Sequence, residues 1–105
     1  MSLIESVPVT RFEARADRAS YSKKLRMYAL STCAFCEDAI AFLKEQGLAF
    51  EYIFIDDLAS DTKRGLKLEL KASYGQISVF PLLIIDGTIP ISGFNREKWI
   101  KILEI

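Results

Sequence analysis

The stretch that decides the fold is residues 25–36, LRMYALSTCAFC. Leu25, Met27 and Ala29 alternate with the residues between them, which is the two-residue period of a β-strand with one more buried face. From residue 34 to residue 46 the apolar residues recur at helical spacing, and Gly47 is a natural end for that helix. Cys33 therefore lies where a strand passes into a helix.

The elements that follow extend this strand and helix into an α/β fold. A second strand at residues 50–55 makes a right-handed parallel βαβ unit the expected topology. Ser60 or Asp61 can cap a helix that runs to about Ser73. Asp86-Gly87 is the two-residue signal of a tight hairpin between strands at residues 82–85 and 88–91, and Asn95 can cap a final helix. The order βαβ-α-ββα predicts a four-stranded mixed sheet flanked by helices.

The chain divides into a short extension and one domain. Its 105 residues suffice for a single core. Residues 7–12 could form a short edge strand, but residues 13–24 are polar and aperiodic. We therefore interpret residues 1–23 as an N-terminal extension and residues 24–105 as the domain.

Composition excludes several classes of function. The formal net charge is zero, so no overall field attracts nucleic acid or an anionic membrane. No apolar run is long enough to span a bilayer and no signal peptide is evident, so we expect a cytoplasmic protein. We expect it to bind neither nucleic acid nor a membrane. The absence of histidine excludes Ser-His-Asp and Cys-His catalysis and His-ligated metals.

The two cysteines, Cys33 and Cys36, carry the expected chemistry. At a helix N-terminus, unpaired backbone N–H groups and the helix dipole favour a thiolate at Cys33, which we take as the nucleophile. Cys36 lies one turn further on the apolar stripe, where it can attack a mixed disulfide at Cys33. The pattern predicts thiol–disulfide exchange, with Cys33 as the nucleophile and Cys36 as the resolving thiol.

Other functions of a CxxC pair stay open. Two thiolates are half of a zinc site, and with no histidine the other ligands would be carboxylates or would come from a second chain. An iron–sulfur cluster shared between two chains at Cys33 is a further alternative. The third is an interaction domain in which the cysteines are incidental. We expect no metal ligand set and no tightly bound cofactor.

Two segments beyond the cysteines are candidates for substrate binding. Pro81 begins an apolar strand from which proline is normally excluded, so we expect a cis Phe80-Pro81 bond, with an ordinary edge-strand proline as the alternative. Gly93, in Ser92-Gly93-Phe94-Asn95, could let a substrate approach the backbone, or could serve only the start of the last helix. Phe35 and Phe94 are either exposed contacts or core residues.

Taken together, residues 28–36, Val79-Phe80-Pro81, residues 84–87 and Ser92-Gly93-Phe94 resemble the glutaredoxin family of the thioredoxin superfamily. The resemblance covers about residues 24–105 and implies the thioredoxin fold. Ser-Gly-Phe is also similar to the NrdH-type redoxins, which thioredoxin reductase reduces.

The resemblance implies the site and its partners. The catalytic residues are Cys33 and Cys36, and a monomer reduces protein or small-molecule disulfides. The electron donor stays open between thioredoxin reductase and glutathione, with NADPH acting only through a reductase. The substrate-binding residues implied are Thr32, Ala34, Phe35, Val79, Phe80, Pro81, Gly93, Phe94 and Asn95.

Overall fold

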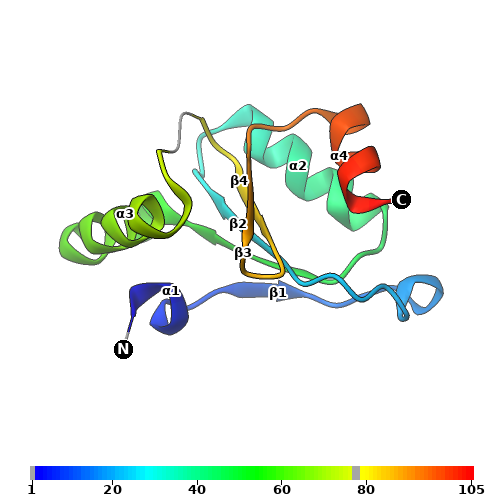
Figure 1. Ribbon diagram of the computed structural model, residues 1–105, viewed down its shortest axis with the longest axis horizontal. Helices are drawn as coiled ribbons and strands as arrows, with labels where there is room; N and C mark the ends of the chain where they lie inside the picture. Colours follow the sequence, from blue (N-terminus) through cyan, green and yellow to red (C-terminus); the bar gives the residue numbers. More distant parts are fainter. Residues whose placement is uncertain (1, 77–78) are drawn as a thin grey trace.

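The computed structural model describes residues 2–76 and 79–105, and it has an α/β architecture (Figure 1). None of the helices within those residues is long and apolar enough to cross a bilayer. The strands are β1 (Thr10–Phe12), β2 (Leu25–Ala29), β3 (Phe50–Phe54), β4 (Leu82–Ile85) and β5 (Ile89–Ser92). The helices are α1 (Leu3–Ser6), α2 (Ala34–Glu45), α3 (Ser60–Tyr74) and α4 (Arg96–Leu103), with short 3-10 helices at Ala16–Arg18 and Ile55–Asp57.

The strands form one mixed sheet in the order β1-β3-β2-β4-β5. The parallel pair is β2 with β3, joined through α2 as predicted, and the other neighbours are antiparallel. The prediction of four strands was one short. Residues 10–12 form a fifth strand along the outer edge of β3, inside the stretch 7–12 for which the sequence left a short edge strand open.

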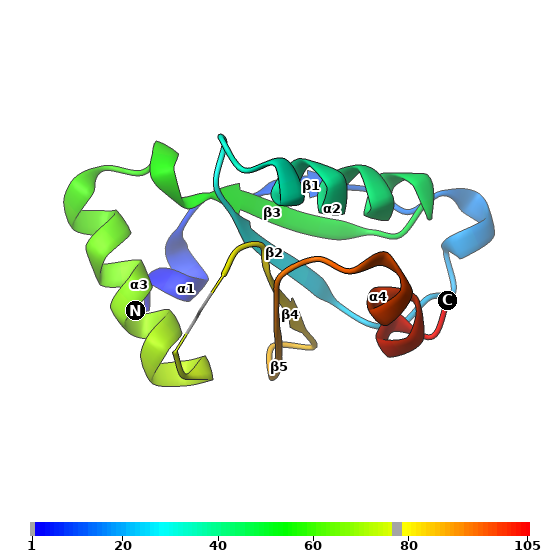
Figure 2. The ribbon, with the colours of Figure 1, turned by 90° about the horizontal axis from the view of Figure 1, so that it is seen from above.

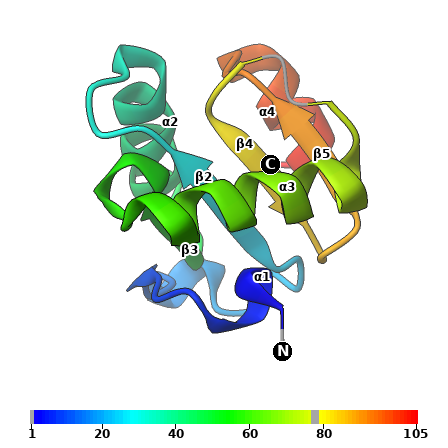
Figure 3. The same ribbon diagram turned by 90° about the vertical axis from the view of Figure 1, so that its left-hand side faces the viewer.

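Helices cover both faces of the sheet (Figures 2 and 3). On one face α2 and α4 pack over the side chains of Leu25, Met27 and Ala29. On the other face α3 packs over Tyr28 and its neighbours. Tyr28 is only 1% exposed, so the alternation in β2 separates two buried faces rather than a buried face from an exposed one.

Local signals set the ends of several elements. Asp86 and Gly87 both have positive φ, 53° and 73°, as the central residues of a primed turn require, and the Thr88 N–H donates to the Ile85 carbonyl at 3.1 Å to close that turn. Asn95 caps α4 as predicted, because its side chain accepts a hydrogen bond from the Lys98 N–H at 2.9 Å. The predicted cap of α3 was wrong: the helix begins at Ser60 itself, its N-cap is Ala59, and no side chain caps it.

The N-terminal extension packs along the domain. Val7 is buried beside Leu66 and Leu70 of α3. The Glu69 carboxylate accepts the Leu3 N–H, with N–O distances of 2.9 and 2.8 Å to its two oxygens. A carboxylate from α3 thus accepts the first N–H of α1, while the Ser2 hydroxyl accepts the N–H of Glu5 at 3.3 Å.

Gly65 of α3 makes room for this contact. A methyl group at Gly65 would lie 2.6 Å from Leu3 Cδ1, so the helix surface is hollowed where the Leu3 side chain rests. Helix α3 therefore offers the extension both a hydrogen-bond acceptor, Glu69, and a hollow at Gly65 that fits Leu3.

We expect Glu69→Ala to detach α1 from α3. The change should lower the free energy of unfolding by about 1–2 kcal/mol, since backbone donors lose a charged acceptor. Urea unfolding measures the loss, and amide exchange at Leu3 and Ile4 should accelerate. Glu13→Ala is the control, because Glu13 is exposed and makes no hydrogen bond within the described residues. Equal stability of the two variants would contradict this role for Glu69.

Candidate active site

The sheet topology gathers the predicted site residues at one edge. Ala29 pairs with Phe54 at the ends of the parallel strands β2 and β3. Tyr28 pairs with Leu82 at the start of β4, and Leu82 pairs with Ser92 at the end of β5. The loops that follow β2, β3 and β5 therefore meet the segment that precedes β4. This edge is where parallel α/β sheets place their ligand sites.

Cys33 is the N-cap residue of α2. Its Sγ accepts a hydrogen bond from the Cys36 N–H at 3.3 Å, in place of the side-chain oxygen that usually caps a helix. The thiol is half-buried rather than enclosed, and the helix dipole presents its positive end to it. A substrate sulfur can therefore approach Cys33 at the start of the helix.

Cys36 lies one turn along α2 and has a different environment. Its side chain is 0% exposed and packs in the core under α2. Burial, followed by the hydrogen bond with Cys33, raises the pKa of the Cys36 thiol to about 12. Both cysteines are free thiols in the structure. The pair thus combines an accessible sulfur with a protonated, desolvated one.

The segment before β4 has the conformation predicted for it. The Phe80-Pro81 bond is cis, and Pro81 is buried. The Pro81 carbonyl accepts the Gly93 N–H at 2.8 Å, which ties this segment to the turn after β5. Gly93 has a φ of +79°, and a methyl group there would lie 3.1 Å from Val79 Cγ2. Both the backbone conformation and the close approach require glycine at this position.

The turn that contains Gly93 is anchored to α4. The Gly93 carbonyl accepts the indole N–H of the buried Trp99 at 3.1 Å. The ring of Phe94 stands edge-on to the ring of Trp99, with a centroid distance of 4.9 Å. Phe94 is therefore half-buried and supports the turn, whereas Asn95 is exposed and its side chain caps α4.

The residues around Cys33 are exposed. Thr32 and Ala34 flank it at the surface. Phe35 is 64% exposed, so of the two aromatic candidates it is Phe35 that points away from the core. Val79 is 53% exposed and Phe80 is half-buried. Apolar side chains from the first turn of α2 and from the segment before β4 therefore lie at the same edge as the partly exposed Cys33.

One residue at this edge was not among the predicted site residues. The Asp56 carboxylate, directly after β3, accepts the Ser31 N–H at 2.9 Å through one oxygen and the Ser31 hydroxyl through the other. The hydrogen bond from the Ser31 hydroxyl is the main cause that holds the pKa of Asp56 below its usual value. The signal available in the sequence was that Ser31 and Asp56 each follow one of two adjacent parallel strands.

Metal ligands do not gather at this edge in the described residues. Within residues 2–76 and 79–105, no three His, Cys, Asp or Glu side chains lie close enough to hold one ion. A metal or cluster at Cys33 would need ligands from outside this set.

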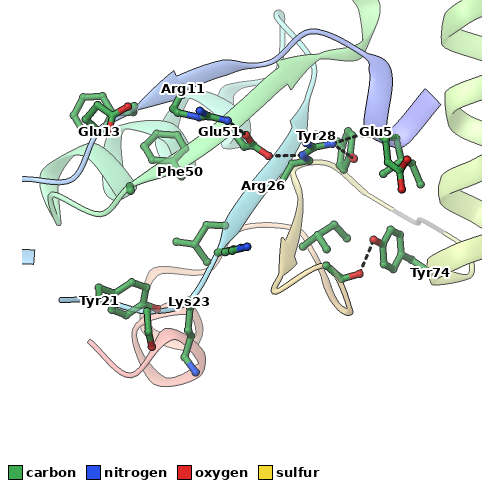
Figure 4. Close-up of a pocket in the computed structure, with 18 residues that line it drawn as sticks. Glu5, Arg11, Glu13, Tyr21, Lys23, Arg26, Tyr28, Phe50, Glu51 and Tyr74 are labelled. Atoms are coloured by element: carbon green, nitrogen blue, oxygen red, sulfur yellow. Dashed lines mark hydrogen bonds and ion pairs between the residues drawn. The ribbon is translucent and has the colours of Figure 1, made fainter. Parts of the chain in front are cut away.

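A hollow of about 610 Å³ opens on the α3 side of the sheet, and none of the predicted site residues lines it (Figure 4). Its walls include Tyr28 and Phe50, together with the ion pair between Arg26 and Glu51, whose N–O distance is 2.7 Å. Lys24 and Gly87 place it toward the end of the sheet opposite to Cys33. The hollow and the cysteine pair are thus separate features.

Comparisons with known proteins agree with this geometry. The family model described as Glutaredoxin matches residues 21–89. No curated protein matches the sequence. Among solved structures, methanoredoxin from Methanosarcina acetivorans is 30% identical with a TM-score of 0.69, over 78% of this chain and 85% of that one.

Two further structures resemble the chain to a similar degree. The glutaredoxin from Methanosarcina mazei Go1 is 29% identical with a TM-score of 0.66, over 78% of this chain and 79% of that one. The glutaredoxin from Archaeoglobus fulgidus is 28% identical with a TM-score of 0.67, over 77% of this chain and 86% of that one. With the family model matching well over half of its length, and with a thioredoxin-like fold that sets a cysteine pair at the start of α2, the chain belongs to the glutaredoxin family.

Proposed function

We propose that the chain is a dithiol–disulfide oxidoreductase in which Cys33 attacks the substrate and Cys36 resolves the product. The observation that carries the proposal is the asymmetry of the pair. Cys33 is partly exposed and its sulfur accepts an N–H at the start of α2, while Cys36 is buried and its pKa is raised to about 12. Membership of the glutaredoxin family supports the same class of reaction.

The exchange proceeds in two displacements. The Cys33 thiolate attacks one sulfur of the substrate disulfide, the substrate S–S bond breaks, and the leaving sulfur takes up a proton. Cys36 then loses its proton and attacks Cys33 Sγ, which releases the second substrate thiol and forms the 33–36 disulfide. The substrate thus gains two electrons and two protons. An external dithiol or glutathione must then reduce the 33–36 disulfide before the next cycle.

The surface around Cys33 supports a proposal about the class of substrate. Phe35 and Val79 expose apolar side chains at the edge where Cys33 lies. Glu37 and Asp38 are exposed acidic residues in the first turns of α2. Apolar side chains can contact a protein segment that carries a disulfide, whereas acidic side chains repel a small anionic disulfide. We therefore propose protein disulfides as the main substrates, with the electron donor to be found by experiment.

The raised pKa of Cys36 predicts selective alkylation. Because a thiol reacts only when deprotonated, Cys36 should stay protonated from neutral pH to well above pH 9 and become reactive only as pH approaches about 12. Iodoacetamide at pH 7.5 should therefore give one adduct at Cys33, and two adducts in urea. Peptide mass spectrometry assigns the site. Adducts of equal yield at both cysteines in the folded protein would contradict the asymmetry.

Variants separate the roles of the cysteines. Cys33→Ser should abolish disulfide reduction, whereas Cys36→Ser should accumulate mixed disulfides at Cys33, because nothing inside the protein then releases the bound substrate. Non-reducing mass spectrometry detects the trapped species. Accumulation in Cys33→Ser but not in Cys36→Ser would reverse the assignment.

A coupled assay tests the function and identifies the donor. NADPH oxidation is followed with insulin as the disulfide substrate, in parallel with thioredoxin reductase and with glutathione plus glutathione reductase. Cys33→Ser serves as the control in each arm. Turnover that depends on Cys33 in one arm supports the proposal and names the donor system. No turnover in either arm would contradict it and favour a cluster-binding or interaction role, for which visible absorbance of the purified protein is the next measurement.

A further inference from the structure

The loop that leads to Cys33 is hydrogen-bonded by a side chain from the segment after β3. Ser31 and Thr32 are exposed and connect the end of β2 to the N-cap of α2. The Cys33 N–H donates to the Leu30 carbonyl at 3.2 Å, which makes the link a tight turn. Within the described residues, Asp56 is the one side chain from another element that hydrogen-bonds this link.

The two bonds of Asp56 fix Ser31 in both position and orientation. One carboxylate oxygen accepts the main-chain N–H, and the other accepts the hydroxyl. Bonds to a charged acceptor are stronger than neutral ones, and two of them leave the residue little rotational freedom. Because Ser31 precedes Cys33 by only two residues, they also restrict where the Cys33 sulfur lies relative to the first turn of α2.

We propose that Asp56 is a positioning residue of the dithiol site, which fixes through Ser31 the turn that presents Cys33 at the N-terminus of α2. The inference rests on the proposed function, since it concerns the nucleophile of that reaction. Asp56 acts through Ser31 and does not itself touch the sulfur. Its role is to keep the thiol in the capping position, where the sulfur accepts the Cys36 N–H at 3.3 Å.

The charge of Asp56 opposes this effect. A carboxylate at the same edge of the sheet disfavours a nearby thiolate, and Asp56 is among the causes that raise the pKa of Cys36. Replacement by alanine would remove the charge and the hydrogen bonds together, so the two effects would partly cancel. Asparagine is the informative change, because it keeps an acceptor for the Ser31 N–H and can donate to the hydroxyl, but carries no charge.

The test compares the rates of iodoacetamide alkylation at Cys33 in Asp56→Asn and Asp56→Ala at pH 7. We expect Asp56→Asn to react at least as fast as the wild type. Asp56→Ala should react about two- to tenfold more slowly than Asp56→Asn, the loss that corresponds to freeing a hydrogen-bonded turn. Asp57→Ala is the matched control, since Asp57 is the adjacent exposed acid and makes no hydrogen bond to Ser31, and it should not react more slowly than the wild type.

Equal rates in Asp56→Ala and Asp56→Asn would overturn the proposal, and so would an Asp57→Ala variant as slow as Asp56→Ala. Far-ultraviolet circular dichroism checks that the variants are folded. If Asp56→Ala is not folded, Ser31→Ala removes one of the two bonds from the other side while the Asp56 charge stays, and it should slow alkylation relative to the wild type. Alkylation requires no disulfide turnover. A failure of the coupled assay would therefore count against the proposed function alone.

Discussion

The first turn of α2 has backbone N–H groups that no residue within the helix can accept, and the Cys33 sulfur accepts one of them from Cys36 at 3.3 Å. The arrangement of the site follows from this interaction. A cysteine at the N-cap has its sulfur at the positive end of the helix, and a second cysteine one turn later faces the core because α2 lies on the sheet. The different burial of two identical side chains thus comes from the helix on which they lie.

The sheet supplies the remaining groups. Because β4 runs antiparallel to β2, the residue before β4 returns to the end of the sheet where β2 stops, and Pro81 arrives there. The hairpin to β5 then brings Gly93 to the same place, where its N–H bonds the Pro81 carbonyl at 2.8 Å. The segments that precede β4 and follow β5 reach the end of β2 because β2, β4 and β5 alternate in direction.

The parts of the structure that local chemistry determines were predictable from the sequence. Asp86-Gly87 adopts the hairpin turn because both residues take positive φ, and Asn95 caps α4 through its own side chain. For β1 the sequence offered only a possible edge strand within residues 7–12, since three residues have no clear period and their stability comes from pairing with β3. The contact between Asp56 and Ser31 likewise exists only once β2 and β3 lie side by side.

The extension also changes what the sheet presents to other chains. Without β1, the five residues of β3 would be an open edge with unpaired N–H and carbonyl groups. With β1 in place, that edge is only three residues long. The opposite edge is β5, where Pro90 has no N–H to donate. Both edges of the sheet are thereby poor templates for the addition of a strand from another chain.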